Sequence, residues 1–448
     1  MRSAVLKEQE VVVIGLGYVG LTLSAFMADR GMKVHGIEIR ELVLGKLREK
    51  SAFFFEPGLD ELLGRTISEG SFTFETELLR SNSERIFIIT VGTPIDANRK
   101  VMSESIIRVT EQVAQVINDG DMVILRSTVM LNTTKNVIQP ILEKSGKSFL
   151  LAFCPERTLE GAALSELGTL PQIVGGVSEE STRVAVEFFS KITSTVVKVS
   201  NSETAELIKL VDNMQRDVKF AIANEIADIC NAEQIKATEV ISAGKFGYPR
   251  TNLPFPGPVG GPCLEKDSYI LAESVLSKNI SPLIALSART VNENMIVSIG
   301  NYVHDWFEAR EPKGHPLKIS ILGIAFKGIP ETNDLRGTPS LKLLSILRKI
   351  LAPGTEFLLW DPVVTNFEAQ NEGHEIEENL ETVLLESNCV ILANNHPSIS
   401  KLSLTLISRL CAPNVLVYDM WGRHDNATYL PQHMSYVSWG SHLVSEMR

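Results

Sequence analysis

Cys263 is the side chain of this sequence whose surroundings point most directly to chemistry. It follows a segment rich in glycine and proline, residues 248–262, and precedes a predicted helix over residues 267–277. The positive end of a helix dipole favours the thiolate, the nucleophilic form of a cysteine. The alternative is a buried structural cysteine, the commonest role of this residue type. The segment by itself leaves both interpretations open.

Lys209 and Asn213 form a second group with chemical potential. They are four residues apart in a predicted helix over residues 202–232, so they lie on one helical face. An ammonium and a carboxamide that point into the same pocket would donate hydrogen bonds to an oxyanion. The alternative is an exposed lysine beside a mid-helix asparagine, with no role in chemistry.

The segment Gly15-Leu-Gly17-Tyr-Val-Gly20 matches the G-x-G-x-x-G fingerprint. It follows an apolar run, residues 11–15, that predicts a buried strand, and it opens a predicted helix over residues 18–31. This is the context that the fingerprint requires. The three glycines permit a tight turn, the approach of a pyrophosphate and close packing of helix on strand. The sequence therefore predicts a dinucleotide site.

Glu38 ends the next predicted strand, residues 33–38. An acid about 20 residues beyond the fingerprint is placed to bind the adenosine ribose hydroxyls. Its charge would repel a 2′-phosphate, which favours NAD over NADP, although Arg40 lies close and weakens this preference. The alternative is a solvated acid at the end of a strand.

Two further loops follow predicted strands of the same region. One covers residues 126–129 and contains Thr128, and the other covers residues 153–161 and contains Glu156 and Glu160. Ligands bind at the carboxyl ends of parallel strands, so carboxylates there could act as general bases. Taken singly, each could instead be a capping or solvated residue.

The elements around these residues predict an α/β protein. In the first 200 residues, apolar strands alternate with helices, which indicates a parallel, doubly wound sheet. The further strands are predicted at residues 86–90, 122–126, 149–153, 172–174 and 195–199, with helices at residues 103–118 and 180–192.

A central helical domain, residues 201–312, is predicted to follow. Its long helix begins with Asn201 or Ser202 as the N-cap and would form a spine and a dimer surface; the alternative is that it packs within one subunit. A second helix is expected over residues 284–309.

Residues 311–315 are a candidate linker to a second α/β domain, residues 313–448. Strands are predicted there at residues 318–322, 356–360, 389–393 and 415–418. The fold class is thus two Rossmann-like, doubly wound parallel-sheet domains joined by a central helical domain. The two α/β halves could be a distant duplication, although the glycine fingerprint is not repeated.

Composition narrows the function classes. The formal net charge of the 448 residues is −11, which argues against nucleic acid or an anionic membrane as partner. The five scattered cysteines and eight scattered histidines favour reduced thiols in a cytoplasmic protein without a metal. Residues 11–28 carry no charge and could pass for a signal peptide or a membrane span, but their three glycines argue against both.

Taken together, these segments resemble the UDP-glucose/GDP-mannose dehydrogenase family, whose members oxidise nucleotide-linked sugars. The matches follow the family order across nearly the whole chain and are highly specific as a set. They comprise residues 15–20, 56–59, 93–96, 127–129, 154–157, 260–267, 323–327 and 334–336, together with Lys209 and Asn213.

The resemblance implies an NAD domain, a central dimerisation domain and a C-terminal domain that completes a UDP-sugar site. It also implies oxidation of the sugar C6 alcohol to a carboxylate with two NAD⁺, through a thiohemiacetal and a thioester on Cys263. Lys209 and Asn213 would stabilise the oxyanions. Thr128 and Asp267 would order water or relay protons, and Glu156 would be the base for thioester hydrolysis.

By the same resemblance, the ligand contacts can be assigned residue by residue. Expected to bind the cofactor are Gly15, Gly17, Tyr18, Val19, Gly20, Glu38, Thr93, Thr128 and Lys266. Expected to bind the substrate are Glu156, Arg157, Glu160, Lys209, Arg216, Arg250, Gly260, Phe326, Lys327 and Arg336, with Arg250 contributed across a homodimer or larger homo-oligomer.

The sugar is less closely defined. Arg157, Arg216 and the Tyr-Pro-Arg250 segment resemble the branch that oxidises UDP-N-acetylhexosamines, whereas the shortened glycine loop and Pro262 depart from it. UDP-glucose is the alternative. A two-electron dehydrogenase and a non-catalytic binding protein are both disfavoured by the joint presence of Cys263, Lys209 and Asn213.

Overall fold

The computed structural model describes residues 10–310, 314–425 and 429–442, so part of the predicted linker, residues 311–313, lies outside the described residues. The chain divides into two compact units. The first unit contains the described chain up to Asn213 together with a second segment, Tyr269–Pro282. The second unit contains Met214–Ser268 and the described chain from Leu283 onward.

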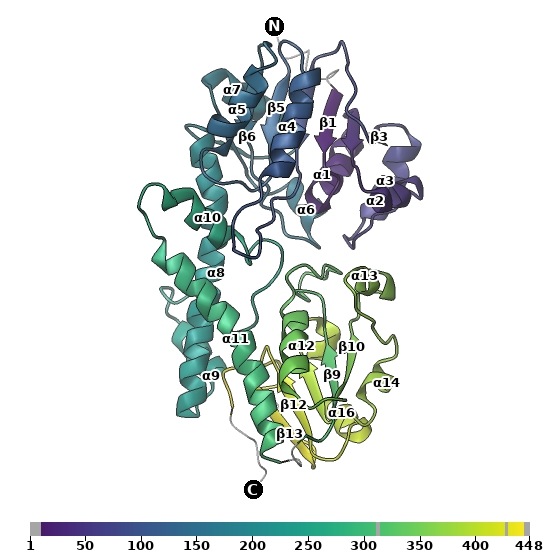
Figure 1. Ribbon diagram of the computed structural model, residues 1–448, viewed down its shortest axis with the longest axis vertical. Coiled ribbons are helices and arrows are strands. Elements are labelled where there is room, and N and C mark those ends of the chain that lie inside the picture. The colour runs from purple at the N-terminus through teal and green to yellow at the C-terminus, as the bar shows by residue number, and fades with distance from the viewer. Residues whose placement is uncertain (1–9, 311–313, 426–428, 443–448) are drawn as a thin grey trace. The chain divides into compact units, whose positions relative to one another are not determined.

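The sheet of the first unit has eight strands in the order β3-β2-β1-β4-β5-β6-β7-β8 (Figure 1). The strands are β1 (Glu10–Ile14), β2 (Val34–Ile37), β3 (Phe72–Glu75), β4 (Arg85–Ile89), β5 (Met122–Leu125), β6 (Leu150–Phe153), β7 (Gln172–Gly176) and β8 (Val196–Lys198). Alternate strand residues face opposite sides, as the two-residue period of a strand requires. Val11 and Val13 join one hydrophobic cluster, and Val12 and Ile14 join the other.

Helices cover both faces of this sheet. The cluster on one face includes residues of α1 (Tyr18–Asp29), α3 (Leu59–Ser68) and α7 (Glu179–Phe189). The cluster on the other face includes residues of α4 (Glu104–Val116), η2 (Thr134–Ile138) and α5 (Gln139–Glu143). The remaining helices of the first 200 residues are α2 (Glu41–Arg48) and α6 (Ala163–Leu167). The predicted α/β architecture of this region is confirmed.

One pairing differs from the predicted parallel sheet. Strand β7 pairs with β6 in the antiparallel sense, with Phe153 opposite Gly175, and β8 then runs parallel to β7. The chain returns from β6 to β7 through residues 154–171, without the right-handed crossover that a parallel neighbour needs.

The central helices include one of 32 residues, α8 (Ser202–Glu233). Asn201, one of the two predicted caps, accepts a hydrogen bond from the Thr204 N–H at 2.8 Å. The others are α9 (Ala237–Lys245), which was not predicted, α10 (Asp267–Leu276) and α11 (Leu283–Glu308). Among the described residues, no helix is both long and apolar enough to cross a membrane.

The second unit contains a five-stranded sheet in the order β10-β9-β11-β12-β13, with every neighbouring pair parallel. Its strands are β9 (Lys318–Leu322), β10 (Glu356–Trp360), β11 (Cys389–Leu392), β12 (Val415–Asp419) and the unpredicted β13 (Met434–Ser438). Its helices are α12 (Pro339–Ile350), α13 (Asn366–Asn371), α14 (Leu380–Leu384), α15 (Pro397–Ser400) and α16 (Leu404–Leu410). Two Rossmann-like sheets joined through helices confirm the predicted fold class.

The two sheets begin with the same local device. Gly15 after β1 and Gly323 after β9 both have positive φ, +95° and +91°. In each case the next residue donates its N–H to an acid at the end of the neighbouring strand. Leu16 donates to Glu38 at 3.0 Å, and Ile324 donates to Asp361 at 2.8 Å.

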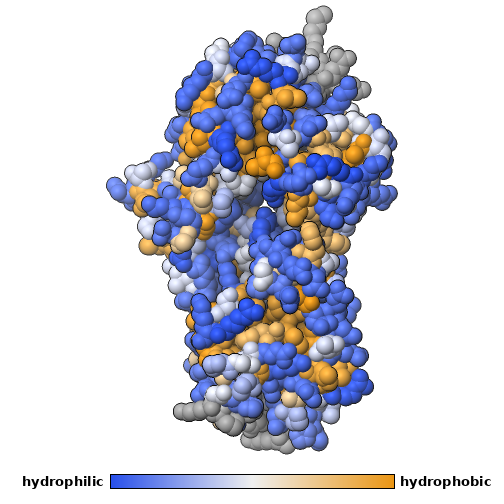
Figure 2. Space-filling model, turned by 45° about the vertical axis from the view of Figure 1, so that its right-hand side comes forward, coloured by the Kyte–Doolittle hydropathy of each residue, from blue (hydrophilic) through white to orange (hydrophobic). Residues whose placement is uncertain are grey.

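The surface is a mixture of hydrophilic and hydrophobic residues, and Figure 2 shows orange hydrophobic patches that interrupt a mostly blue face. Along α8, four large apolar side chains are exposed: Leu207, Val211, Ile222 and Ile229. At 3.6 residues per turn they fall within roughly 60° of one another around the helix axis. They therefore form a single exposed stripe, here named the α8 stripe.

Candidate active site

The glycine fingerprint forms a turn that is open to a ligand. Gly15 takes its positive φ there, and its N–H donates to the carbonyl of Ile37 at 2.8 Å. Gly17 precedes α1 in an extended conformation, and a Cβ on it would meet only the Arg40 guanidinium, at 4.0 Å. A Cβ on Gly20 would lie 2.0 Å from the carbonyl oxygen of Gly15. The turn therefore leaves backbone N–H groups at the start of α1 accessible to a phosphate.

Glu38 is buried at the end of β2 and is held by five donors. They are the N–H groups of Leu16, Ile39 and Arg40 and two guanidinium nitrogens of Arg40, all at 2.9–3.0 Å. Burial raises the pKa of Glu38, but the hydrogen bonds and charge of Arg40 outweigh it, and the pKa lies below the ordinary value. Since the Arg40 side chain is half-exposed, it can give way to a ribose that needs the same oxygens.

Thr93 and Thr128 meet at the carboxyl edge of the first sheet. The Thr93 hydroxyl donates to the Thr128 carbonyl at 2.5 Å, and the neighbouring Ser127 hydroxyl donates to the Val91 carbonyl at 2.6 Å. These bonds join the loops that follow β4 and β5.

Tyr18, at the start of α1 beside Val19, stacks on Phe54 with ring centroids 4.1 Å apart.

Glu156 is buried after β6 and is bound on both oxygens. Arg126 donates two hydrogen bonds to Oε2, at 3.1 and 2.6 Å, and the N–H groups of Arg157 and Thr158 donate to Oε1 at 2.7 and 2.8 Å. Burial raises the pKa of Glu156, but the Arg126 charge and these hydrogen bonds lower it by more. The pKa therefore lies below the ordinary value of a glutamate. This Arg126 contact was not anticipated from the sequence.

Arg157 and Glu160 belong to the same loop. The Arg157 guanidinium pairs with Asp212 of α8 at 3.1 Å and donates to the Pro171 carbonyl at 2.9 Å. Arg157, a predicted substrate residue, is therefore already engaged in two contacts within the protein. Next to Glu160, the N–H of Gly161 donates to Glu56 at 2.7 Å. Glu56 lies in a segment that only the family resemblance singled out.

Lys209 and Asn213 lie about one turn apart on α8, within the first unit, and Asn213 is buried. One turn before Lys209, the buried Glu206 accepts hydrogen bonds from the N–H groups of Asn132 and Thr134, at 2.6 and 2.8 Å. Glu206 thereby attaches this helix to the loop that follows β5 and to the start of η2. Burial raises the pKa of Glu206 despite these bonds.

Cys263 lies in the second unit and is partly exposed. Its carbonyl accepts the N–H groups of Lys266 and Asp267, at 3.2 and 3.0 Å, which turns the chain into α10. Asp267 is buried, and the ammonium of Lys266 lies 3.0 Å from its carboxylate.

The glycine loop before Cys263 packs closely on the loop after β9. A Cβ on Gly260 would lie 2.5 Å from the Gly337 carbonyl oxygen, and one on Gly261 would lie 2.6 Å from the Phe326 ring. Both positions therefore exclude a side chain, and the structure brings Gly260 and Phe326 into one neighbourhood.

The predicted basic substrate residues of the second unit have different surroundings. Arg336 is fixed by Asp334 through bonds of 2.7 and 3.0 Å, and the Lys327 ammonium lies 5.3 Å from the centroid of Phe326. Arg216 is exposed on α8. Arg250 is exposed over the Tyr248 ring, 4.8 Å from its centroid.

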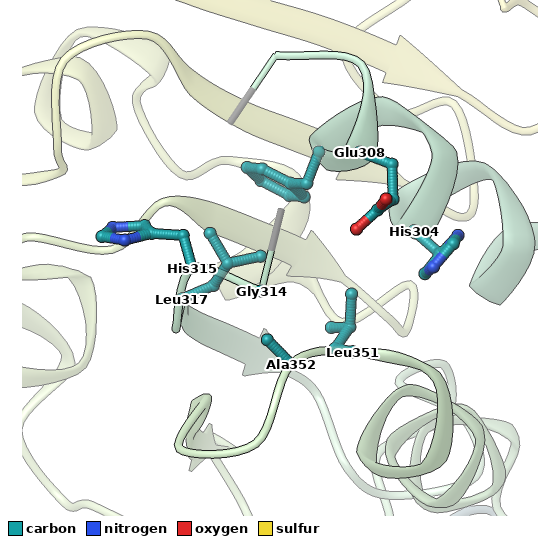
Figure 3. A pocket seen from close by; sticks show the side chains of 8 residues that line it. His304, Glu308, Gly314, His315, Leu317, Leu351 and Ala352 are labelled. Carbon is teal, nitrogen blue, oxygen red and sulfur yellow. The ribbon is translucent and has the colours of Figure 1, made fainter. Parts of the chain in front are cut away.

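The predicted residues are thus divided between the two units. The first unit holds the glycine fingerprint, Glu38, Thr93, Thr128, the Glu156 loop, Lys209 and Asn213, and the second holds the remaining ones, including Cys263 and Asp267. A separate small pocket lies between α11, the residues just before β9 and the turn after α12 (Figure 3). His304, Glu308, His315 and Leu351 are among its lining residues, and no predicted site residue lines it.

Comparison with known protein families gives three matches in chain order. Residues 9–224 match the NAD binding domain of the UDP-glucose/GDP-mannose dehydrogenase family, residues 203–294 match its central domain, and residues 320–426 match its UDP binding domain.

Individual relatives agree with this assignment. A UDP-N-acetyl-D-mannosamine dehydrogenase of Pyrococcus horikoshii is 30% identical over 413 residues, which cover 91% of this chain and 94% of the relative. The solved structure of a UDP-D-ManNAc dehydrogenase from the same organism matches with a TM-score of 0.86 and 28% identity, covering 97% of this chain and 100% of that chain. An NDP-N-acetyl-D-galactosaminuronic acid dehydrogenase of Methanosarcina mazei matches with a TM-score of 0.80 and 27% identity, covering 97% and 96%.

Proposed function

Because the chain belongs to the UDP-glucose/GDP-mannose dehydrogenase family, we propose that it oxidises the C6 hydroxyl of a UDP-sugar to a carboxylate with NAD⁺. We propose further that the sugar is an N-acetylhexosamine and that Cys263 carries the intermediate. The observation that carries the proposal is the partly exposed thiol between the packed glycine loop and the start of α10.

The first unit fits NAD. Gly17 leaves the approach to the α1 N-terminus open, and Glu38 offers the ribose two oxygens that Arg40 can vacate. When bound, the nicotinamide accepts a hydride from C6 in each of two successive oxidations. The residues of this unit assigned to the cofactor are Gly15, Gly17, Tyr18, Val19, Gly20, Glu38, Thr93 and Thr128; Lys266, also assigned to the cofactor, belongs to the second unit.

Cys263 divides the reaction into manageable steps. After the first oxidation, its thiolate adds to the C6 aldehyde, and the carbonyl oxygen takes up a proton to give a thiohemiacetal. The second oxidation removes the C6 hydrogen as hydride and that hydroxyl proton, which leaves a thioester. Water then adds to the thioester carbon, and the C–S bond breaks to release the carboxylate and the thiol.

Polar side chains assist these steps. Lys209 and Asn213 donate hydrogen bonds to the C6 oxygen when it carries negative charge. Glu156 is ionised and orients the hydrolytic water, with its carboxylate fixed by Arg126. Thr128 and Asp267 order water and relay protons.

Basic and aromatic residues account for binding of the UDP-sugar. Phe326, Lys327 and Arg336 are assigned to the sugar and diphosphate. The other residues assigned to the substrate are Arg157, Glu160, Arg216, Arg250 and Gly260. The relatives named for UDP-N-acetylmannosamine support an N-acetylated sugar and make that compound the first candidate.

The enzyme is proposed to act as a cytoplasmic homodimer. The α8 stripe supplies an apolar surface of the kind that a second copy of the chain covers. A dimer would also let Arg250 of one protomer reach the substrate of its partner.

A substrate panel tests the proposal. UDP-glucose and UDP-N-acetylated glucosamine, galactosamine and mannosamine are each supplied with NAD⁺, and NADH is counted per sugar consumed. We expect about two NADH per N-acetylhexosamine and loss of turnover in Cys263→Ser. One NADH per sugar together with full activity of Cys263→Ser would overturn the mechanism, and preferential turnover of UDP-glucose would overturn the assigned sugar.

A further inference from the structure

Four buried polar side chains form a connected network between α8 and α11 in the second unit. Asp217 and Asn224 come from α8, and Arg289 and Asn292 come from α11; each is at most 1% exposed. The Asn292 amide donates to the Asp217 carboxylate at 2.8 Å, and the Asn224 amide donates to the Asn292 carbonyl oxygen at 2.9 Å. The Arg289 guanidinium pairs with Asp217 at 2.7 Å.

This network makes hydrogen bonds to the Cys263 loop both before and after Cys263 in the sequence. Before it, the Asn224 side chain exchanges two hydrogen bonds with the backbone of Gly257, at 3.0 and 3.1 Å. After it, Arg289 donates to the carbonyl of Leu264, the residue next to Cys263, at 3.2 Å, and the Ser268 hydroxyl donates to Asp217 at 3.3 Å.

Gly257 is also packed closely against Trp421. A Cβ there would lie 2.6 Å from the Trp421 ring, whose indole N–H donates to the Ala393 carbonyl at 3.2 Å. At Gly257 the loop is therefore held by a carboxamide and packed against an aromatic ring, so its path there is closely determined.

Stability alone does not account for such a network. Buried charged groups replaced by apolar residues of similar size often leave a protein equally or more stable. Here Asn224 and Arg289 make hydrogen bonds with backbone atoms of the loop that presents the thiol, and Asp217 and Asn292 hold these two side chains in place.

We propose that Asn224, Asn292, Asp217 and Arg289 are positioning residues that hold Cys263 in its reactive place. This inference rests on the proposed function, in which Cys263 is the nucleophile. A displacement of about 1 Å at a reacting group can cost roughly a hundredfold in rate, so even a small relaxation of the loop would slow the chemistry.

The test uses the full chain with Asn224→Ala and Arg289→Lys. The control is Thr290→Ala, an exposed neighbour on α11 outside the network. The rate at which iodoacetamide alkylates Cys263 is measured by mass spectrometry of the Cys263 peptide, over a range of pH and below the melting temperature. The kcat and the KM for NAD are measured on the same variants. The other four cysteines are buried, so the modified peptide is distinguishable.

We expect at least about a tenfold change in the alkylation rate, with a shifted pH profile, and a tenfold to hundredfold fall in kcat for both variants. The KM for NAD and the control should stay unchanged. A lower melting temperature with unaltered alkylation and kcat would mean that the network is only structural and would overturn the proposal. If Asn224→Ala does not fold, Arg289→Lys, which keeps the charge beside Asp217, decides in the same way.

Cys263→Ala separates this inference from the function on which it rests. Undiminished turnover in Cys263→Ala would remove the catalytic role of the thiol. The alkylation rates of the network variants would still report whether these residues fix the loop.

Discussion

Glu156 is an acid whose charge is fixed by its neighbours. Arg126 holds one oxygen, two backbone N–H groups hold the other, and the pKa of Glu156 lies below its ordinary value. Such a carboxylate is ionised throughout the neutral range. It is therefore suited to orient a water molecule by accepting its hydrogen bond, and less suited to store a proton.

Glu156→Gln should slow thioester hydrolysis more than thioester formation. The amide keeps the shape of the side chain but loses the charge that polarises water, and loss of such assistance costs roughly a hundredfold or more. We expect the Cys263 peptide to carry a sugar adduct that mass spectrometry detects after mixing with UDP-sugar and NAD⁺. Glu111→Gln, at an exposed position of α4, is the control. Unchanged turnover without an adduct would contradict the assigned role.

The same acid should leave a signature in the pH dependence of stability. An acid with a lowered pKa in the folded chain stabilises the fold fully above its unfolded pKa, about 4.3 for glutamate, and loses this contribution as the pH falls through the folded pKa. The melting temperature of the wild type should therefore fall more steeply below about pH 4.3 than that of Glu156→Gln. At pH 7 the variant should be less stable by roughly 2–5 kcal/mol, because Arg126 loses its buried counter-charge. Parallel melting curves across pH would contradict this account.

From the sequence, single residues could be proposed for the site only where the chemistry depends on local spacing. The glycines, Glu38 and Cys263 are identified by their neighbours in sequence and by the strand or helix beside them. The partners of Arg157 and Glu56 were not predictable, because Asp212 and Gly161 lie 55 and 105 residues away in the sequence. Such contacts form only when loops from different strands meet.

At the scale of elements, the packing of α1 on β1 depends on the last glycine of the fingerprint. Gly20→Ala places a methyl group 2.0 Å from the Gly15 carbonyl oxygen, so the turn or the helix must move. Forced overpacking costs about 1–3 kcal/mol or more, and here it also distorts the phosphate turn. We expect at least tenfold weaker NAD binding by calorimetry.

Gly45→Ala is a matched control for that substitution. Gly45 lies in α2, and a Cβ there has no neighbour within 4 Å. Alanine should be neutral or stabilise the helix by up to about 1 kcal/mol. Equal NAD affinity in both variants would contradict the packing argument.

Most long elements follow from hydrophobic periodicity, but strand direction does not. The run at residues 172–174 predicts a strand, and nothing in its composition shows that β7 opposes β6. Strands β3 and β13 were missed because each is short and mixes polar with apolar residues, Phe72–Glu75 and Met434–Ser438. Their assignment depends on a neighbouring strand, which the sequence does not identify.

At the scale of the whole molecule, the α8 stripe predicts self-association. Ile222→Lys places a charge in the middle of the stripe and should shift the protein from dimer to monomer, as measured by light scattering after size exclusion. Leu385→Lys makes the same change at another exposed position and should leave the dimer intact. A wild-type mass of one chain, 49.4 kDa, would contradict the prediction.

The shared start of the two sheets has a consequence for protein engineering. Glu38 is bound partly by the half-exposed Arg40 side chain, whereas Asp361 is bound by the backbone N–H groups of Ala325, Val363 and Val364, which cannot leave without unfolding their loops. Changing the nucleotide preference of the first half therefore requires substitutions at an acid and an arginine. Installing a dinucleotide site in the second half would instead require two loops to be rebuilt.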